Sequence, residues 1–437
     1  MNAYKYCLRY YLPVFFAFCF NLAVCQSPYH VYFGNLHSHT SHSDGVASPA
    51  DAFAFARDSA GLDFLAVTDH IGSFHLVPYV PMNTPWQWDN CMSMADSFTV
   101  VGSFVGIAGW EWTSEKYGHI NVFNTSDMIR DSLVLWYHYI ISEFYNWLLN
   151  HPPAFAMFNH PGGLGIGSYM DYNNFEYISS ALDSAIHLFE FQMVTQEPFY
   201  NLALSKGWHV SPVWNQDNHQ YNWGTYNDCR AGIWADTLSR QSLFDAIIKG
   251  RTFSTMDKNA SIWMDVDGND MGSVLTVRQS ATFHLSIADV DNENWLWLGL
   301  ISENGTILGI DSITGNFDTT FTIDLTNEKW IYAKAMQADS NCLWSAPIYF
   351  ENPNNSIVNF NYDANVLVYP NPTHDMVLVS ANDAYNTVSV FDYMGVRHFD
   401  SQFSKEIKID LREFAPGIYF IEILSPQKRV VKKIIKE

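Results

Sequence analysis

Between residues 29 and 255, short apolar runs alternate with segments of helical character. The run FLAV at 64–67, within LDFLAVTDH, is continuously apolar, as expected for a strand that is covered on both faces. The segment 48–61 has the signature of a helix, with Ser48 as the N-cap and Asp51 at the capping-box position. This alternation predicts an α/β fold built as a parallel barrel.

Polar side chains follow the apolar runs at the points where the strands are expected to end. In a parallel barrel these ends share one face, and the reactive groups collect there. The sequence therefore predicts one site built from many strand ends. The residues in this position are His37, His39, Asp69, His70, Glu111, His160, Glu190, Asp217 and His219.

The stretch GNLHSHTSHSDG suggests the chemistry of that site. His37 and His39 are two residues apart on a strand end, so their side chains point the same way and can bind one cation. An H-x-H pair alone is equally typical of a surface turn. Asp44, and His119 after a later turn, add further ligand types, which favours a metal site over a polar loop.

The pattern changes after residue 255. Residues 256–352 contain alternating strands separated by Gly, Asn and Asp, which predicts a β-sandwich. Residues 353–365 form an Asn-rich linker. The last section, 366–437, contains four expected short strands and ends in the basic KRVVKKIIKE.

Residues 1–25 read as a secretory signal peptide, with sparse positive charge followed by a short apolar stretch. Cleavage is expected between Cys25 and Gln26. Lipid attachment at Cys25 is an alternative, but Val24 is larger than the residue that usually precedes an acylated cysteine. No later run is apolar and long enough to predict a transmembrane segment.

The charge balance excludes one class of partner. With 23 Lys and Arg against 45 Asp and Glu, the formal charge is −22, so the chain has no cationic excess with which to bind nucleic acid. A small anionic substrate is still allowed, because a bound metal can invert the local field. Three cysteines follow the signal, Cys91, Cys229 and Cys342, and they are expected to be buried rather than disulfide-bonded.

Taken in order, the motifs HSHTSHSDG, VTDH, GWEWTSEKYGH, NHPGG and NQDNH resemble those of the polymerase and histidinol phosphatase (PHP) superfamily over residues 29–255. The resemblance implies a distorted seven-stranded α/β barrel of PHP or TIM-like type with a trinuclear metal centre. The segments KGRTFSTMDKNASIWMDVDGNDMGS and WIYAKAMQADSNCLWSAPIYF are similar to the β-sandwich of CehA/McbA-type metallohydrolases.

The PHP resemblance implies three metal subsites, two of which share Glu111, and it makes Glu111, Asp217 and His160 the expected catalytic residues. Two or three divalent ions are implied, and the mixed ligands suit Zn, Mn or Fe better than Mg or Ca. The sequence departs from the commoner GSD-x-H ending, because Asn215 and Gln216 precede Asp217. The implied ligands are His37, His39, Glu111 and Asp217 in the first subsite, His119 and His160 with Glu111 in the second, and Asp44, His70 and His219 in the third.

Two further residues are candidates for substrate binding. Glu190 ends a strand on the expected face, where it could bind substrate or only form a hydrogen bond at the edge of the core. Arg251 could meet an anionic substrate or take part in a structural ion pair. The Trp-rich PMNTPWQWDN is expected to form a lid, a sugar-stacking surface or simple aromatic packing.

The final section has its own resemblance. VLVYPNPTHDMVLVS, VSVFDYMGVRHF, IDLREFAPGIYFIEI and KRVVKKIIKE look like the C-terminal sorting domain of proteins secreted by the type IX system in Bacteroidota. This implies handling by the type IX secretion machinery and a final location at the cell surface or in the medium.

These observations favour a secreted metal-dependent hydrolase of small-molecule esters. Phosphomonoesters or phosphodiesters, cleaved by metal-activated water, are the first hypothesis. Carboxylic or carbamic esters are the second, and an inactive barrel that serves as a surface binding module is the third. An amidohydrolase barrel is disfavoured, because the only lysine between Arg9 and Arg130 is Lys116, in a polar segment.

Overall fold

The computed structural model places most of the chain in two all-β units and one α/β region. The predicted signal at 1–25 and linker at 353–365 lie outside the described residues. The described residues are 29–71, 82, 84–129, 141–163, 170–325, 327–351, 366–381, 387–392, 396–424 and 429–437.

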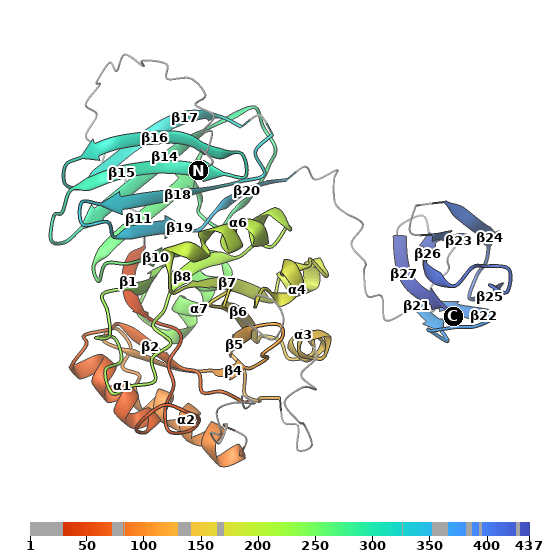
Figure 1. The fold of residues 1–437 in the computed structure, drawn as a ribbon, viewed down its shortest axis with the longest axis horizontal. Helices are drawn as coiled ribbons and strands as arrows, with labels where there is room; N and C mark the ends of the chain where they lie inside the picture. Colours follow the sequence, from red (N-terminus) through yellow and green to blue (C-terminus); the bar gives the residue numbers. More distant parts are fainter. Residues whose placement is uncertain are drawn as a thin grey trace, which may run out of the picture.

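The first sheet of the α/β region starts with three parallel strands, β1 (His30–Asn35), β2 (Phe64–Val67) and β3 (Val105–Ala108). On the other side of β1, the sheet continues through β9 (Arg230–Ala235) and β10 (Thr252–Thr255), which are both paired antiparallel. All four residues of β2 are buried, as its continuous apolar run predicts. Figure 1 shows β1 and β2 beside the helices α1 and α2.

A second sheet holds the next five strands, in the order of the chain. The first, second and third strands pair antiparallel with one another, and the third, fourth and fifth pair parallel. They are β4 (Trp110–Trp112), β5 (His119–Phe123), β6 (Phe155–Asn159), β7 (Ile186–Phe191) and β8 (Ser211–Trp214).

The expectation of a wholly parallel barrel is therefore wrong in part. Residues 113–118, which join β4 to β5, are too few for the crossover that a parallel pair needs, so the two strands form a hairpin. A closed seven-stranded barrel is not confirmed either, because the strands divide into two hydrogen-bonded sheets.

Backbone hydrogen bonds connect the two sheets at both seams. At one seam the Gly109 N–H donates to the Val67 carbonyl at 2.9 Å, and the Glu111 N–H donates to the Asp69 carbonyl at 3.1 Å. At the other seam the His39 N–H donates to the Asn218 carbonyl at 2.9 Å. Gly109 allows the close approach, because a Cβ there would lie 3.0 Å from Thr68 Cγ2 across the seam and 2.8 Å from the Val122 carbonyl oxygen of β5. The strand ends that carry the polar motifs are thus held together.

Side chains from both sheets share one hydrophobic cluster. Phe64 and Ile107 from the first sheet are in it with Met157 and Leu188 from the second, and all four are fully buried. The helix α7 (Arg240–Ile248) adds Leu243 and its neighbours to the same cluster. The two sheets therefore enclose a common core instead of packing as separate layers.

Helices flank the α/β region, and the first begins as the sequence predicts. In α1 (Pro49–Asp58) the Ser48 side chain accepts from the Asp51 N–H, and Asp51 accepts in return from Ser48, which completes the capping box. The others are α2 (Pro85–Phe98), α3 (Ile141–Leu149), α4 (Tyr172–Phe175), α5 (Ser180–Asp183), the 3-10 helix η2 (Val194–Gln196) and α6 (Glu197–Ser205). Every helix in the described part of the chain is too short or too polar to cross a membrane.

Two sheets form the predicted sandwich, drawn in green to blue in Figure 1. One sheet contains β12 (Asn269–Asp270), β11 (Ala260–Val266), β14 (Ser280–Asp289) and β17 (Phe317–Asp324). The other contains β13 (Val274–Thr276), β20 (Ile348–Glu351), β18 (Trp330–Gln337), β19 (Cys342–Ser345), β15 (Trp295–Ser302) and β16 (Gly305–Ile313).

The sandwich and the α/β region share a sheet. β19 pairs antiparallel with β10, so the hydrogen-bonded ladder continues across residue 255, where a domain boundary is predicted. Phe253 on β10 is fully buried and belongs to the sandwich core. The two parts are therefore joined by main-chain pairing as well as by side-chain packing.

The C-terminal unit is entirely β. Its described part contains seven strands rather than the four expected, because the longer motifs each fold into more than one strand. One sheet contains β21 (Val366–Tyr369), β22 (Met376–Ala381) and β25 (Glu406–Asp410), and the other contains β24 (Arg397–Gln402), β23 (Thr387–Asp392), β26 (Gly417–Leu424) and β27 (Arg429–Lys436).

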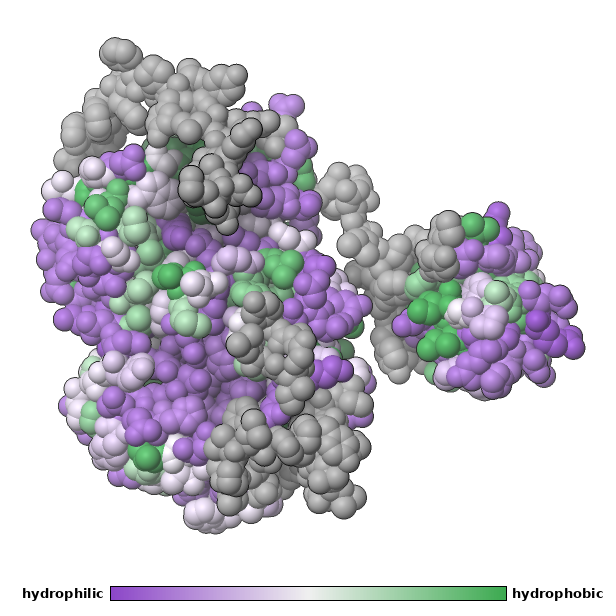
Figure 2. All heavy atoms as spheres, viewed as in Figure 1, coloured by the Kyte–Doolittle hydropathy of each residue, from purple (hydrophilic) through white to green (hydrophobic). Residues whose placement is uncertain are grey.

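The surface and the cysteines agree with the sequence expectations. Figure 2 shows a mostly hydrophilic face with scattered hydrophobic patches, as expected when the large apolar side chains fill the cores. Cys91, Cys229 and Cys342 are buried and unpaired.

A histidine ties the loop before β8 to the sandwich, and we predict that it makes stability pH-dependent. His209 lies 2.6 Å from Asp183 and 3.0 Å from Glu351 at the end of β20. Burial opposes protonation of this histidine, but hydrogen bonds to both carboxylates outweigh it and raise its pKa to about 9.

The unfolded chain loses this proton near pH 6.5. The stabilisation is therefore complete below about pH 6.5 and disappears as the pH rises through about 9. Melting temperatures measured from pH 6 to 10 should fall less steeply for His209→Asn and Glu351→Gln than for the native chain. Equal slopes in all three proteins would contradict the assignment.

Candidate metal centre

Ten acidic and histidine side chains meet where the two sheets are joined. They comprise the nine predicted metal ligands and Glu190, and each lies within 4 Å of at least one other member. They come from the ends of β1, β2, β6, β7 and β8, from the loop after β1, and from β4 and β5. The strand-end pattern in the sequence thus corresponds to one cluster in space.

His37 and His39 form the centre of the cluster. Their Nε2 atoms lie 3.1 Å apart, so the two rings point at the same spot. Glu111 lies 3.3 Å from His37 and 3.4 Å from His39, and Asp217 lies 3.3 Å and 2.9 Å from them. These four residues are the ones expected to form the first subsite.

His119 and His160 approach Glu111 from the second sheet. His119 Nδ1 lies 3.2 Å and His160 Nε2 lies 3.7 Å from Glu111 Oε1, and the two ring centroids are 5.0 Å apart. His160 has a φ of 33° and Asp217 a φ of 47°, in the left-handed region that few non-glycine residues adopt. Backbone strain of this kind is typical of functional sites.

Asp44, His70 and His219 gather on the other side of His39. Asp44 lies 3.2 Å from His219 Nε2 and 3.8 Å from His70 Nε2, and the rings of His39 and His219 stack with centroids 4.1 Å apart. His39 thus faces two neighbouring groups, and the third expected subsite gains it as a fourth candidate ligand.

Glu190 has a role that the sequence left open. It is fully buried, and its Oε1 lies 2.8 Å from His37 Nδ1, while its Oε2 accepts from the His160 N–H at 2.8 Å. A carboxylate on Nδ1 fixes the orientation of the ring and leaves Nε2 facing the cluster. Glu190 therefore positions two of the candidate ligands.

Three polar residues that the sequence did not single out support the cluster. Asn159 donates to Glu111 Oε1 at 2.7 Å and to Asn121 Oδ1 at 2.9 Å, and the Thr113 hydroxyl lies 2.8 Å from His70 Nδ1. The signal for Asn159 was its place at the end of an apolar strand, directly before a predicted ligand. Asn121 and Thr113 carried no such signal.

Asp69 organises the loop that carries Asp44. It accepts from the Thr40 N–H at 2.8 Å, from the Thr40 hydroxyl at 2.6 Å and from the Ser43 hydroxyl at 2.6 Å. The loop is thereby held against the end of β2, which sets the position of the Asp44 carboxylate.

Three carboxylates of the cluster, those of Glu111, Asp217 and Asp44, are ionised across the neutral range. Burial would raise the pKa of Glu111, but His70, His37 and His119 together hold it well below its usual value. His37 and His39 lower the pKa of Asp217 in the same way. Burial would raise the pKa of Asp44, but the hydrogen bond with His219 and the other neighbouring histidines lower it to about 2.

The donor set fits divalent cations. Four groups of three or four of these side chains have ligand atoms within 4.8 Å of one another, so each group could hold an ion. The buried atoms His39 Nδ1, Glu111 Oε2 and Asp217 Oδ1 complete no hydrogen bond within the described part of the chain. Buried polar atoms without such partners are costly unless another group satisfies them, and a cation would do so.

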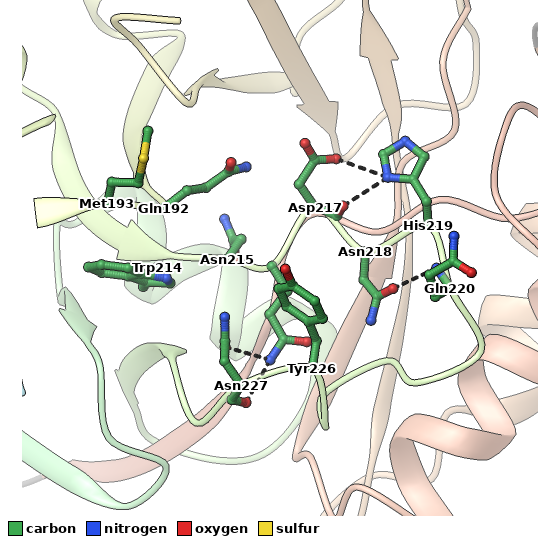
Figure 3. Close-up of a pocket in the computed structure, with 11 residues that line it drawn as sticks. Gln192, Met193, Trp214, Asn215, Asp217, Asn218, His219, Gln220, Tyr226 and Asn227 are labelled. Carbon is green, nitrogen blue, oxygen red and sulfur yellow. Dashed lines mark hydrogen bonds and ion pairs between the residues drawn. The ribbon is translucent and has the colours of Figure 1, made fainter. Parts of the chain in front are cut away.

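The cluster opens to solvent on one side. Glu111, His37 and His39 are fully buried, whereas the Asp217 side chain is 24% exposed and that of His219 is 30% exposed. A pocket of about 380 Å³ lies beside these two residues. Figure 3 shows Asp217 and His219 at one end of the pocket, with Trp214 and Met193 at the other.

Arg251 does not belong to this site. Its guanidinium lies over the Tyr29 ring at 3.9 Å and 3.9 Å from Asp270, and the side chain is 3% exposed. It sits where the α/β region meets the sandwich, since Tyr29 also contacts Trp263 on β11. Of the two alternatives that the sequence left open for Arg251, its surroundings match the structural ion pair.

Comparisons with known proteins assign the end of the chain. Residues 367–437 match the family model of the secretion system C-terminal sorting domain. This confirms the predicted sorting domain and indicates secretion to the cell surface or the extracellular space. A comparison with curated proteins found no match.

Among solved structures, the chain is similar to a two-domain protein from Bacteroides vulgatus that contains a predicted PHP-like metal-dependent phosphoesterase. The two share 17% identity with a TM-score of 0.42, over 73% of this chain and 96% of that one. PsfC from Pseudomonas syringae is similar at 14% identity and a TM-score of 0.33, over 46% of this chain and 82% of that one. The CehA/McbA subtype stays a prediction.

We predict that removing the Glu190 carboxylate weakens metal binding without dismantling the cluster. Glu190→Gln keeps the shape of the side chain but gives His37 a weaker hydrogen-bond partner, and such changes cost about 10- to 100-fold in metal affinity. Competition with a chromogenic chelator for Zn²⁺ would measure the loss. Glu143→Gln, the same change on the exposed face of α3, should leave the affinity unchanged. Equal affinities in both variants would contradict the positioning role.

Proposed function

We propose that the protein is a secreted metal-dependent hydrolase of small-molecule esters, with phosphomonoesters or phosphodiesters as its first substrate class. The observation that supports this most strongly is the arrangement around Glu111, a fully buried carboxylate shared by two of the candidate metal groups. Shared carboxylates hold ions close together, and two-metal sites suit phosphate oxygens.

The nine predicted ligands would hold two or three divalent ions, with Zn, Mn or Fe best matched to the mixed histidine and carboxylate set. Bound ions supply Lewis-acid chemistry, because they acidify water and stabilise negative charge on the group being cleaved. Glu111, Asp217 and His160 are the proposed catalytic residues.

Residues of the chain itself admit the substrate, position the candidate ligands and bind the part of the substrate that does not react. Asp217 and His160 lie on the open side of the cluster, where an ester can reach them. Glu190 holds His37 and the His160 backbone in place, so the ligands do not need to reorganise when substrate binds. The pocket beside Asp217 can take the part of the substrate that does not react.

In this proposal, seven of the ten strands that the two sheets contain within residues 29–255 form a distorted barrel. The shared hydrophobic cluster and the hydrogen bonds across both seams support this. The sandwich at 256–352, the linker at 353–365 and the sorting domain at 366–437 complete the proposed organisation. A cleaved signal at 1–25 would precede them.

Carboxylic or carbamic esters are the second candidate class. The pocket beside the cluster favours them in one respect, because its described lining contains no lysine or arginine to pair with a phosphate group. The inactive binding module becomes the conclusion only if no ester is hydrolysed.

Hydrolysis assays with the full chain, prepared without chelator and supplied in turn with Zn, Mn and Fe, test this proposal. We expect turnover of nitrophenyl phosphate or bis-nitrophenyl phosphate, and a loss of about 100-fold or more in His37→Ala, which removes a ligand from two candidate groups. His30→Ala, at the exposed start of β1, is the matched control. Turnover of only nitrophenyl acetate or a naphthyl carbamate would move the assignment to the second class.

Secretion gives an independent prediction. Deleting residues 366–437 in a host with a type IX system should leave the protein inside the outer membrane and largely folded, because the sorting domain has its own hydrophobic core. Immunoblots of cell fractions and medium would measure this. An unchanged amount in the medium would show that export does not depend on the domain.

A further inference from the structure

The pocket beside Asp217 and His219 is lined largely by side-chain amides. The amides lie on both sides of it and come from the end of β7 and from the loop after β8 (Figure 3). The amide residues are Gln192, Asn215, Gln216, Asn218, Gln220 and Asn227.

Some of these amides hold the loop in place. The Gln216 amide donates to Asn227 at 3.0 Å and accepts from the Gly224 N–H at 2.9 Å, and the Asn218 amide is bonded to Asn222. Gln220 is exposed, and its bond to Asn218 uses only its backbone N–H. Its side-chain amide offers both a donor and an acceptor to a ligand.

Apart from Asp217 and His219, which belong to the metal cluster, the described lining of the pocket carries no charged side chain. Arg230, which follows the same loop, turns its guanidinium away and donates to the carbonyls of Asn227, Cys229 and Gly224. The part of a ligand that fills the pocket away from Asp217 and His219 is therefore uncharged, because an anionic group there would have no partner of opposite charge.

An aromatic ring completes the recognition surface. The Tyr226 side chain belongs to the lining and is 64% exposed, so its ring is available for stacking. A sugar ring suits this combination, since its C–H face can lie against an aromatic ring while its hydroxyls bond to neutral amides.

We propose that the substrate is the ester of a neutral sugar, with the sugar in the amide-lined pocket against Tyr226 and the ester group next to Asp217 and His219. The proposal rests on the hydrolase function proposed above and adds the class of the substrate's non-reacting part. Tyr226 and Gln220 would determine specificity, while the metal centre performs the chemistry.

The test compares esters that differ only in the sugar. For the full chain, kcat/KM is measured for a hexose 1-phosphate and for methyl phosphate, and again for a 6-O-acetyl hexose and methyl acetate. We expect the sugar ester to be preferred at least about tenfold in one pair. That preference should fall about tenfold in Tyr226→Ala and Gln220→Ala. Tyr221→Ala, a neighbouring exposed tyrosine that packs on Phe55 and Trp223, should keep it.

A preference near one in the native chain, or one that survives both pocket substitutions, would overturn the proposal while leaving the hydrolase function intact. If no ester is hydrolysed, the proposed hydrolase function is wrong, and sugar binding then tests the assignment of the pocket. Calorimetric titration with methyl hexosides should then show binding by the native chain and Tyr221→Ala but not by Tyr226→Ala. Absence of binding by the native chain would also contradict the proposal that the pocket binds a sugar.

Discussion

A buried carboxylate at the junction of two sheets is the constraint on which the rest depends. Glu111 is fully buried, and a buried carboxylate is costly unless groups of opposite charge surround it. Histidines from the first sheet, His37 and His70, and from the second sheet, His119, supply that environment. The same interaction that makes the burial tolerable also brings both sheets' strand ends to one point.

The gathering of the candidate ligands could be predicted from the sequence to a large extent, because most of them obey a geometric rule. Most of them lie at or near the carboxyl end of an apolar strand, and these strand ends converge, whereas His119 begins β5 and Asp44 lies in the loop after β1. The orientation of the ligands was beyond prediction, since Glu190 meets His37 across more than 150 positions of sequence. Asn121 and Thr113 support the cluster, yet in the sequence they look like ordinary polar residues.

The individual helices and strands could be predicted from the sequence, but the pairing of the strands could be predicted less well. The helix at Ser48 and the strands at 64–67 and 155–159 follow from local patterns. Whether neighbouring strands run parallel depends on connections that local patterns do not describe, as the β4–β5 hairpin shows. Arg251 illustrates the same limit, because its position beside a strand end did not indicate that it faces Tyr29.

The pairing of β10 with β19 has a consequence for how this molecule could be divided. A chain cut after residue 255 would keep every candidate ligand, yet it would expose the hydrogen-bonding edge of β10 along its whole length. Free edges of this kind recruit strands from other molecules and lead to aggregation. The sandwich therefore protects the edge of β10, and with it the half of the molecule that carries the candidate ligands.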